Sequence, residues 1–546
     1  MKRIAFALLF CLAASLAVAA DDKPNIIFIF TDDHAFQAIS AYGSNRNVTP
    51  SLDRLAAEGM RFTRCCVTNS ICSPSRAVIK TGKYGHLNGV LTNNLPPGGF
   101  DASQQTFPKL LQAAGYQTAM VGKWHLGGYA RANDVGFDHT EILIGQGPYY
   151  NPPMWRNGER VQHTGYTTHI INDLTIEWIR NRDPSKPFMI MSQHKAPHRE
   201  WDPYPTYWER YKDVYFAYPE TFDDIYDGNR RALLEQDQTI SETLNYRDLK
   251  INHPQGFLDA LTAEQRTAWL AMFATRRAEY EAVRNDPVAL KKWKYQTYMR
   301  DYMACVAAVD DAIGRLLDFL EEEGLAENTF IMYSSDQGFY IGEHGMFDKR
   351  FMYNESFKTP LIVRWLGQIP NPGSVNHAIV SNLDFPSTFL DVAGVEIPAD
   401  MQGRSFVPLL RGKTPADWRT SFYYHYYEYP GVHMVKKHYG VYDGRFKLIH
   451  FYDDIDHWEL IDTVEDPNEL RNVYGQPRYA AEQARLKAEL ARLKVELQVP
   501  AVEINTRSYI FDEEMGATRP GMRGTFERVR RDIERRQAVL REHGRD

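Results

Sequence analysis

The sequence has few cysteines for a chain of 546 residues: it contains five, and Cys11 lies in the apolar segment at the start. Exported proteins that depend on a disulfide scaffold are much richer in cysteine, so that class is excluded. Cys65 and Cys66 are adjacent and would point to opposite faces of a strand, which disfavours a disulfide between them. We therefore expect both to be small buried residues.

Beyond its first twenty residues the chain lacks any apolar run near the roughly 20 residues that a membrane span needs. Those first twenty have the layout of a secretory signal peptide: Lys2 and Arg3, an apolar stretch over residues 4–18, and small residues up to Ala20. A lipid anchor on Cys11 is disfavoured because Phe10 precedes it where a small residue is expected. We predict an exported protein, periplasmic or secreted, without a membrane span.

An excess of basic residues is also missing. The formal net charge is −7, and removal of the signal peptide takes away two further cations. This balance argues against a nucleic-acid partner. The sequence shows no internal repeat and no low-complexity tract. Its length exceeds what one core usually supports, so we expect a large domain over residues 21–415 and a smaller one over residues 416–546.

Strand and helix patterns alternate through the large domain. Residues 25–30 form an apolar, β-branched run typical of a strand buried on both faces, and Thr49-Pro50 begins a helical pattern that Gly59 ends. Further segments continue the alternation: a helix at 107–114, a strand at 116–121, a helix at 306–320 and a strand at 330–333. The pattern predicts an α/β fold with a large, mostly parallel mixed sheet flanked by helices.

Two other regions differ in character. Residues 200–300 are rich in aromatic and charged side chains and poor in strand pattern, so we expect a helical and loop insertion near the substrate entrance. In the C-terminal domain, Asp443-Gly444 between apolar segments at 439–442 and 446–451 is a strong hairpin signal. Helical patterns follow at 477–497 and 524–542, which predicts an α+β subdomain with an antiparallel sheet.

Acidic and amide residues follow two of the predicted buried strands: Asp32 and Asp33 after the first, Asp336 and Gln337 after the strand at 330–333. Ligands of open α/β sheets gather beyond the carboxyl ends of the strands. Each pair by itself is equally typical of a helix cap or a solvated loop. Together at two strand ends, they favour a binding site.

The segment Cys72-Ser73-Pro74-Ser75-Arg76 places a thiol before a proline suited to begin a helix, with an arginine on the first turn. A helix N-terminus and a guanidinium both favour an anion at residue 72. We therefore expect a free thiol here to have a lowered pKa and to act as a nucleophile. A helix start that happens to contain cysteine is the plain alternative.

The segment resembles the Cys-x-Pro-x-Arg signature of the formylglycine-dependent sulfatases, whose fold is alkaline phosphatase-like. Other motifs of this family follow in its order through most of the chain, and these are Asp32-Asp33, Gly122-Lys123-Trp124-His125-Leu126-Gly127, Ala196-Pro197-His198, Asp336-Gln337-Gly338, Gly342-Glu343-His344-Gly345 and Asp348-Lys349-Arg350. Several short motifs in the right order are far more specific than one. Gln337 departs from the pattern, because many members carry Asn there.

The resemblance implies a sulfuric ester hydrolase in which a maturation enzyme oxidises Cys72 to formylglycine. It implies one Ca²⁺ per chain, held by residues whose oxygens suit a hard cation, and these are Asp32, Asp33, Asp336, Gln337 and the matured residue 72. In the family mechanism, a hydroxyl of the hydrated aldehyde attacks sulfur, and Arg76 stabilises the developing charge.

The remaining roles also follow from the resemblance. Lys123 and Lys349 would neutralise the sulfate oxygens, His198 would protonate the leaving sugar oxygen, and His125 would deprotonate the second hydroxyl so that sulfate leaves. His34, His86 and His344 are expected to be structural, with His344 also a candidate to line the pocket.

The segments at 195–199 and 460–469, with the aromatic insertion, look most like bacterial N-acetylglucosamine-6-sulfatases and relatives acting on heparan-type glycans. A 6-O-sulfated N-acetylglucosamine, attacked from a chain end, is therefore the predicted substrate. Three alternatives stay open: a sulfatase acting on algal polysaccharides, a phosphonate or phosphate ester hydrolase, and an inactive sugar-binding homologue in which Cys72 stays a thiol.

Overall fold

The computed structural model describes residues 23–95, 98–502, 506, 511–512, 517–518 and 522–542. The signal peptide predicted at residues 1–20 lies outside these residues. No helix in the described ranges is both long and apolar enough to cross a membrane.

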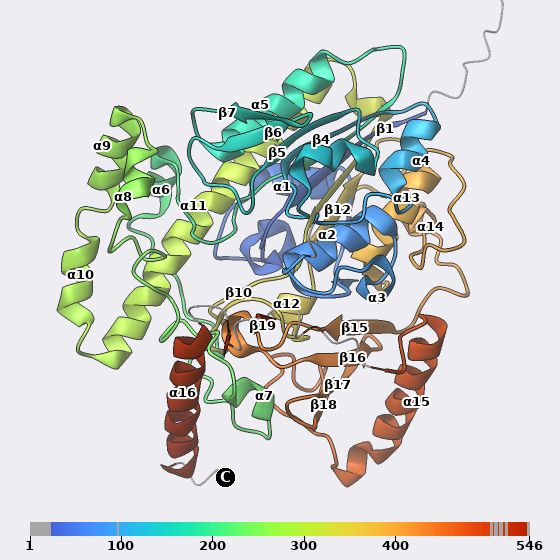
Figure 1. Cartoon of the computed structure of the whole chain (residues 1–546). Helices are drawn as coiled ribbons and strands as arrows, with labels where there is room; N and C mark the ends of the chain where they lie inside the picture. The colour runs from blue at the N-terminus through green and yellow to red at the C-terminus, as the bar shows by residue number, and fades with distance from the viewer. Residues whose placement is uncertain are drawn as a thin grey trace, which may run out of the picture.

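A ten-stranded mixed sheet forms the centre of the large domain, as predicted (Figure 1). Its order is β13-β2-β12-β9-β1-β8-β4-β5-β6-β7, and the five strands from β9 to β5 run parallel to one another. The strands are β1 Asn25–Thr31, β2 Met60–Phe62, β4 Gln117–Lys123, β5 His139–Leu143, β6 Pro153–Arg156, β7 Glu159–Gln162, β8 Phe188–Gln193, β9 Thr329–Ser335, β12 Leu361–Arg364 and β13 Ser374–Asn376.

The sheet separates two hydrophobic cores, because successive side chains of β1 point to opposite faces. Ile27 and Ile29 pack into one core and Ile26 and Phe28 into the other. The first core is covered by α1 Pro50–Ala57, α5 Thr167–Arg180 and α11 Pro287–Glu322, and the second by α2 Cys72–Thr81, α4 Phe107–Ala113 and α13 Phe385–Val392.

The segment predicted as a helical and loop insertion, residues 200–300, contains several helices, and its last residues run on into a long helix. Residues 205–283 contribute α6 Pro205–Tyr211, α7 Arg231–Leu234, α8 Gln255–Asp259, α9 Ala263–Met272 and α10 Arg276–Val283, and α8, α9 and α10 lie to one side of the large sheet in Figure 1. Residues 287–300, however, begin α11, which continues into the sheet-covering core. Its first half buries Tyr295 and Tyr298 where the expected aliphatic spacing is absent.

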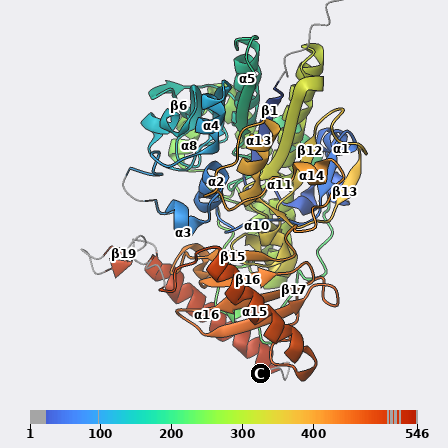
Figure 2. The ribbon, with the colours of Figure 1, turned by 90° about the vertical axis from the view of Figure 1, so that its right-hand side faces the viewer.

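A four-stranded antiparallel sheet forms the C-terminal region, as predicted, and lies below the large sheet in Figures 1 and 2. Its strands are β15 Phe422–Tyr426, β16 His438–Tyr442, β17 Phe446–Phe451 and β18 His457–Asp462, and the helices that follow are α15 Ala480–Glu496 and α16 Met522–Glu542. The hairpin between β16 and β17 turns at Asp443-Gly444, where Gly444 has a φ of 93°. One face of this sheet packs on the large domain and the other on α15.

Candidate active site

The carboxyl ends of β1 and β9 bring four of the predicted site residues together. Thr31 of β1 is paired in register with Ser335 of β9, so the residues that follow each strand lie side by side. The backbone amide of Asp33 donates to Oδ1 of Asp336 over 3.1 Å. Carboxylate oxygens of Asp32, Asp33 and Asp336 lie within 4.8 Å of one another, and all three residues are buried.

The amide of Gln337 completes this oxygen-rich cluster. Its Nε2 donates to Asp33, while its buried Oε1 has no hydrogen-bond partner. A buried acceptor without a donor is costly unless a cation or water satisfies it. Burial and the neighbouring Asp32 raise the pKa of Asp336 to about 8, and burial raises the pKa of Asp33 to about 6. The surroundings thus do not fully stabilise the negative charge of the cluster. Its carboxylate and amide oxygens are the ligands that suit a hard divalent cation.

Three cationic side chains surround the carboxylates. Lys123, at the end of β4, pairs with Asp32, and Nζ of Lys349 lies 2.7 Å from both carboxylate oxygens of Asp33. The fully buried Arg76 donates from Nη2 to Oδ2 of Asp336 over 3.1 Å. These cations would be available to an anion that entered the cluster.

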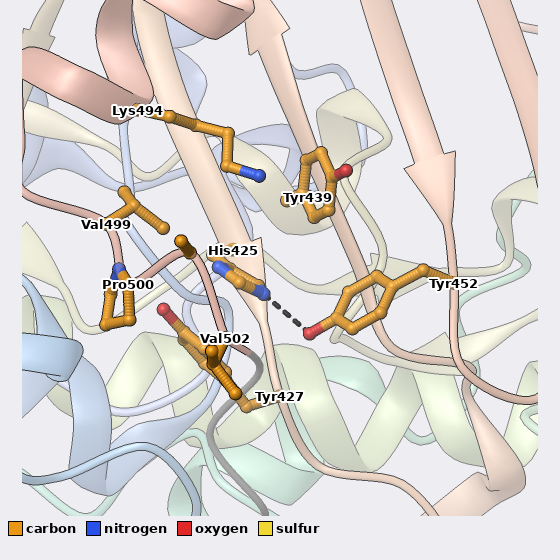
Figure 3. Close-up of a pocket in the computed structure, with 9 residues that line it drawn as sticks. His425, Tyr427, Tyr439, Tyr452, Lys494, Val499, Pro500 and Val502 are labelled. Carbon is orange, nitrogen blue, oxygen red and sulfur yellow. Dashed lines mark hydrogen bonds between the residues drawn. The ribbon is translucent and has the colours of Figure 1, made fainter.

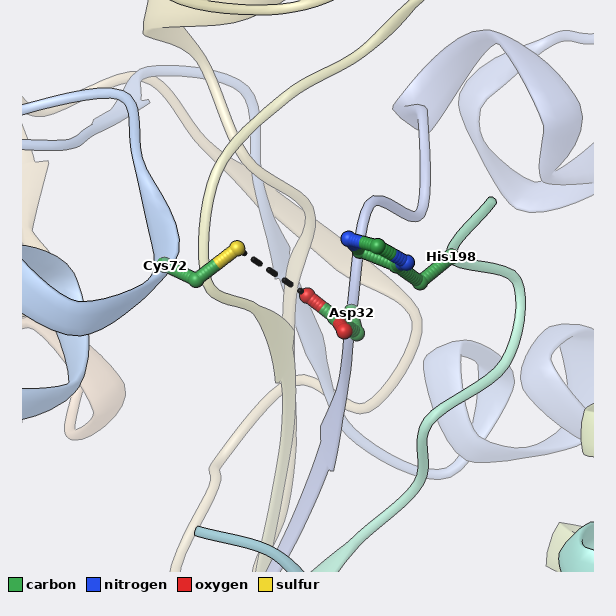
Figure 4. A group of neighbouring side chains, drawn as sticks. All are labelled: Asp32, Cys72 and His198. Atoms are coloured by element: carbon green, nitrogen blue, oxygen red, sulfur yellow. Dashed lines mark hydrogen bonds between the residues drawn. The ribbon is translucent and has the colours of Figure 1, made fainter. Parts of the chain in front are cut away.

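Cys72 is the first residue of α2, and its side chain points into this cluster (Figure 4). Its Sγ lies 3.6 Å from Oδ1 of Asp32. The lowered thiol pKa expected from the sequence is wrong, because burial raises the pKa of Cys72 despite the nearby lysines. Cys65, Cys66 and Cys305 are also buried free thiols, as expected for the first two. A buried neutral thiol makes a poor nucleophile at neutral pH.

His198 lies across the cluster from Cys72 (Figure 4). Its Nδ1 lies 2.6 Å from the carbonyl oxygen of Arg199, which can only accept, so Nδ1 carries the proton and Nε2 faces the site. Nε2 lies 3.7 Å from Oδ2 of Asp33. Burial, together with the Lys123 cation, holds the pKa of His198 well below its usual value.

His125 reaches the site through two neighbours. The hydroxyl of Ser73, the residue after Cys72, donates to its carbonyl oxygen over 2.8 Å. Its Nε2 lies 3.2 Å from Nε2 of Gln146, whose Oε1 accepts from Lys123. A positive φ of 53° at His125 marks a constrained turn at this position.

Three further histidines make polar contacts inside the fold. His34 is buried against the hydroxyl of Tyr333, and Nε2 of His86 lies 2.9 Å from the carbonyl oxygen of Leu497. Nδ1 of His344 lies 2.7 Å from Asp224.

Several site residues were missed by sequence reasoning. Gln193, the last residue of β8, accepts from Nη1 of Arg76 over 2.8 Å, and Gln146 follows β5. Both lie at the same sheet edge as the acidic pairs, so the strand-end rule could have found them. His433, from the C-terminal region, lies 2.9 Å from Oδ2 of Asp348, beside Lys349. No sequence signal links residues so far apart.

A cavity of about 210 Å³ opens beside His198. It is lined on one side by residues of the large domain and on the other by residues of the insertion, and these include Gln146, Tyr149, Lys195, Glu200, Asp202, Arg247 and Phe257. Nζ of Lys195 lies 4.5 Å from the centre of the Tyr149 ring, which leaves an aromatic and charged wall next to the imidazole.

Known proteins resemble the chain over most of its length. A family model described as Sulfatase matches residues 24–395, and one described as N-sulphoglucosamine sulphohydrolase, C-terminal, matches residues 342–496. An N-acetylglucosamine-6-O-sulfatase of Bacteroides thetaiotaomicron is 49% identical over 478 residues, which cover 84% of each chain. The human N-acetylglucosamine-6-sulfatase is 28% identical over 431 residues, covering 75% of this chain and 68% of that one.

A solved structure extends the likeness to three dimensions. It shows a protein in complex with its substrate D-glucosamine-2-N,6-O-disulfate, and it superposes with a TM-score of 0.85 at 47% identity, covering 88% of this chain and 99% of that chain.

Proposed function

Because the chain belongs to the sulfatase family, we propose that it hydrolyses the 6-O-sulfate ester of a glucosamine unit in a heparan-type glycan. The observation that carries the proposal is the position of Cys72 at the start of α2, facing three carboxylates, two lysines and an arginine. The 49% identity to an N-acetylglucosamine-6-O-sulfatase and the structural likeness to a protein bound to a 6-O-sulfated glucosamine support this substrate.

Maturation of Cys72 to formylglycine is part of the proposal. The sulfur atom stands where the oxygen of the matured residue would lie. A Ca²⁺ would be held by Asp32, Asp33, Asp336 and the free Oε1 of Gln337, and it would supply positive charge beside the nucleophile and the sulfate. The unpaired Oε1 and the raised pKa of Asp336 both fit such an ion. We also propose that the protein is exported and that a formylglycine-generating enzyme acts on it.

The remaining steps concern the attack on sulfur and the charge of the sulfate oxygens. The matured residue would supply a hydroxyl that, after losing its proton beside the cation, displaces the sugar oxygen at sulfur. The sulfate oxygens carry negative charge throughout the reaction. The side chains placed to neutralise this charge are Arg76, Lys123 and Lys349.

The two histidines would move the protons. His198 faces the site with Nε2, so a proton there can pass to the departing sugar oxygen. The approach of an anionic sulfate opposes the effect of Lys123 and favours the protonated imidazole. His125, held beside residue 72 by Ser73, would accept a proton from the second hydroxyl, so that sulfate leaves and the aldehyde forms again.

The substrate is tested by measuring sulfate release from N-acetylglucosamine-6-sulfate, from D-glucosamine-2-N,6-O-disulfate and from a matched phosphate monoester. We expect the 6-O-sulfate to be lost from both sugars and phosphate to be released much more slowly. Release of 2-N-sulfate alone, or preference for the phosphate ester, would contradict the proposal.

Replacing His198 by alanine is expected to slow release of the sugar sulfate by roughly 10²- to 10⁴-fold, because an alkoxide is a poor leaving group without a proton. The same substitution should slow hydrolysis of 4-nitrophenyl sulfate far less, because its phenolate leaves without protonation. The measurement is the ratio of kcat for the two substrates in each enzyme.

The buried His194, on the same segment but hydrogen-bonded through its backbone to β1, provides the matched control. His194→Ala should leave the ratio of the two rates unchanged even if it lowers both. An unchanged ratio in His198→Ala would remove His198 from the role of acid.

A further inference from the structure

A second cavity lies in the C-terminal region, lined by residues of the small sheet and of the end of α15 (Figure 3). His425, Tyr427, Tyr439 and Tyr452 come from β15, β16, β17 and the loops that follow them, Lys494 comes from α15, and residues 499–502 form the rim. None of these residues belongs to the candidate active site.

The aromatic rings of this cavity are held in fixed positions. The rings of His425 and Tyr427 are stacked with centroids 3.7 Å apart, and those of Tyr439 and Tyr452 are 5.3 Å apart. The two nitrogens of His425 lie 2.8 Å from the hydroxyl of Tyr423 and 2.7 Å from that of Tyr452. Burial holds the pKa of His425 well below its usual value, so the ring is neutral and serves as a hydrogen-bonding wall.

Among the described residues that line the cavity, Lys494 is the one with a charged side chain. Its Nζ lies 4.4 Å from the centre of the Tyr439 ring, and burial lowers its pKa. No carboxylate is found among the lining residues that the structure describes. Figure 3 shows the amine beside the Tyr439 ring and above the rings of His425 and Tyr427. The cavity therefore offers aromatic faces, phenolic hydroxyls and a cation, which together suit a sugar ring carrying an anionic group.

The cavity lies on the face of the small sheet that is turned away from the catalytic cluster. Tyr424 of β15 donates to the carbonyl oxygen of Arg350 on the catalytic side, whereas its neighbour His425 points to the opposite face. The two sites are nevertheless linked through the loop after β15, because Glu428 accepts from the amide of Asn93 over 2.9 Å and Asn93 accepts from the amide of Ser73 over 3.0 Å.

We propose that this cavity is a second saccharide-binding site, which holds a sulfated sugar of the same glycan at a distance from the scissile ester. The choice of a sulfated glycan as the ligand rests on the function proposed above. A polymer held at two places dissociates more slowly than one held at the active site alone, so the second site would favour long chains over monosaccharides.

The test compares Lys494→Ala and Tyr439→Ala with the parent enzyme on two substrates, D-glucosamine-2-N,6-O-disulfate and a size-defined heparan-type oligosaccharide sulfated at N and O6. We expect each variant to raise KM for the oligosaccharide by about fivefold or more, because a charge-assisted contact or a stacking face is lost. Values of kcat/KM for the monosaccharide should stay unchanged, and Lys494→Arg should retain the parent KM.

Lys487 supplies the matched control, since it lies on the same helix and its Nζ is 4.7 Å from the centre of the Trp458 ring. Lys487→Ala should change neither KM. Direct binding is measured by calorimetry with the oligosaccharide and its desulfated form on a Cys72→Ala background, which leaves the ligand intact.

Two results would overturn the second site. One is an oligosaccharide affinity that Lys494→Ala leaves unchanged, and the other is an affinity for the desulfated oligosaccharide equal to that for the sulfated one. Either result would leave sulfate release from the monosaccharide unaffected, so failure of this proposal is distinguishable from failure of the proposed function.

Discussion

Cys72→Ala is expected to lower the rate of sulfate release by roughly 10⁴-fold or more, the order of loss seen when a covalent nucleophile is removed. We expect this loss because residue 72 begins α2 and its side chain points at the carboxylate cluster, where the proposed nucleophile acts. The fold should be retained, because alanine occupies less space than cysteine and favours a helix. The measurement is sulfate release beside a thermal melt of both proteins.

Cys66→Ala is the matched control, since Cys66 is a buried free thiol in β3 Cys65–Cys66 and lies outside the cluster. It should retain activity. If Cys72→Ala keeps a substantial fraction of the parent rate while folded, the nucleophile is a different group.

Peptide mass distinguishes the matured residue from a thiol. Conversion of Cys72 to formylglycine lowers the mass of its peptide by roughly 18 Da, whereas conversion to a sulfenic, sulfinic or sulfonic acid raises it. The aldehyde should also react with an aminooxy probe. Because burial raises the pKa of the Cys72 thiol, protein carrying only thiol is expected to bind sulfated sugar without turnover.

The carboxylate cluster could be predicted from the sequence because one physical rule places its residues together. Asp32 and Asp336 each follow a buried strand, and parallel strands end at the same sheet edge. Gln193 ends β8 and Gln146 follows β5 at the same sheet edge, so the same rule could have found both. The contact between Asp348 and His433 depends on how the C-terminal sheet packs on the large domain, which no local pattern encodes.

The pKa of Cys72 was predicted with the wrong sign for a related reason. Sequence reasoning counted the helix N-terminus and Arg76, which are local, and not the burial or the two carboxylates from other strands. Arg76 also donates to Asp336 and Gln193, so its charge is shared with these neighbours. The helix predicted at 306–320 is only the second part of α11, because the first part buries tyrosines and lacks the aliphatic spacing on which the prediction depended.

Removal of the metal is expected to lower the rate by roughly 10²-fold or more, because the charge that stabilises the nucleophile and sulfate is lost. Dialysis against a chelator should produce the loss, and Ca²⁺ should restore the rate better than Mg²⁺, since a flexible all-oxygen site favours the larger ion. Full activity in excess chelator would exclude the site.

A second readout does not depend on turnover. An ion that binds only the folded chain stabilises it by about 2.7 kcal/mol at 100 times its Kd, so Ca²⁺ should raise Tm of the parent protein. Asp336→Asn and Gln337→Ala should lose this Ca²⁺-dependent increment, because each removes an oxygen ligand or its charge.

Asp310→Asn is the matched control for the loss of a buried carboxylate, since Asp310 accepts from the amides of Ser51 and Leu52 at the start of α1, away from the cluster. It should lower Tm in the presence and absence of Ca²⁺ alike and keep the increment between them. An increment that survives Asp336→Asn but vanishes in Asp310→Asn would place the ion elsewhere. The Ca²⁺-dependent increase in Tm thus identifies which oxygen atoms bind the ion. A loss of activity alone cannot identify them.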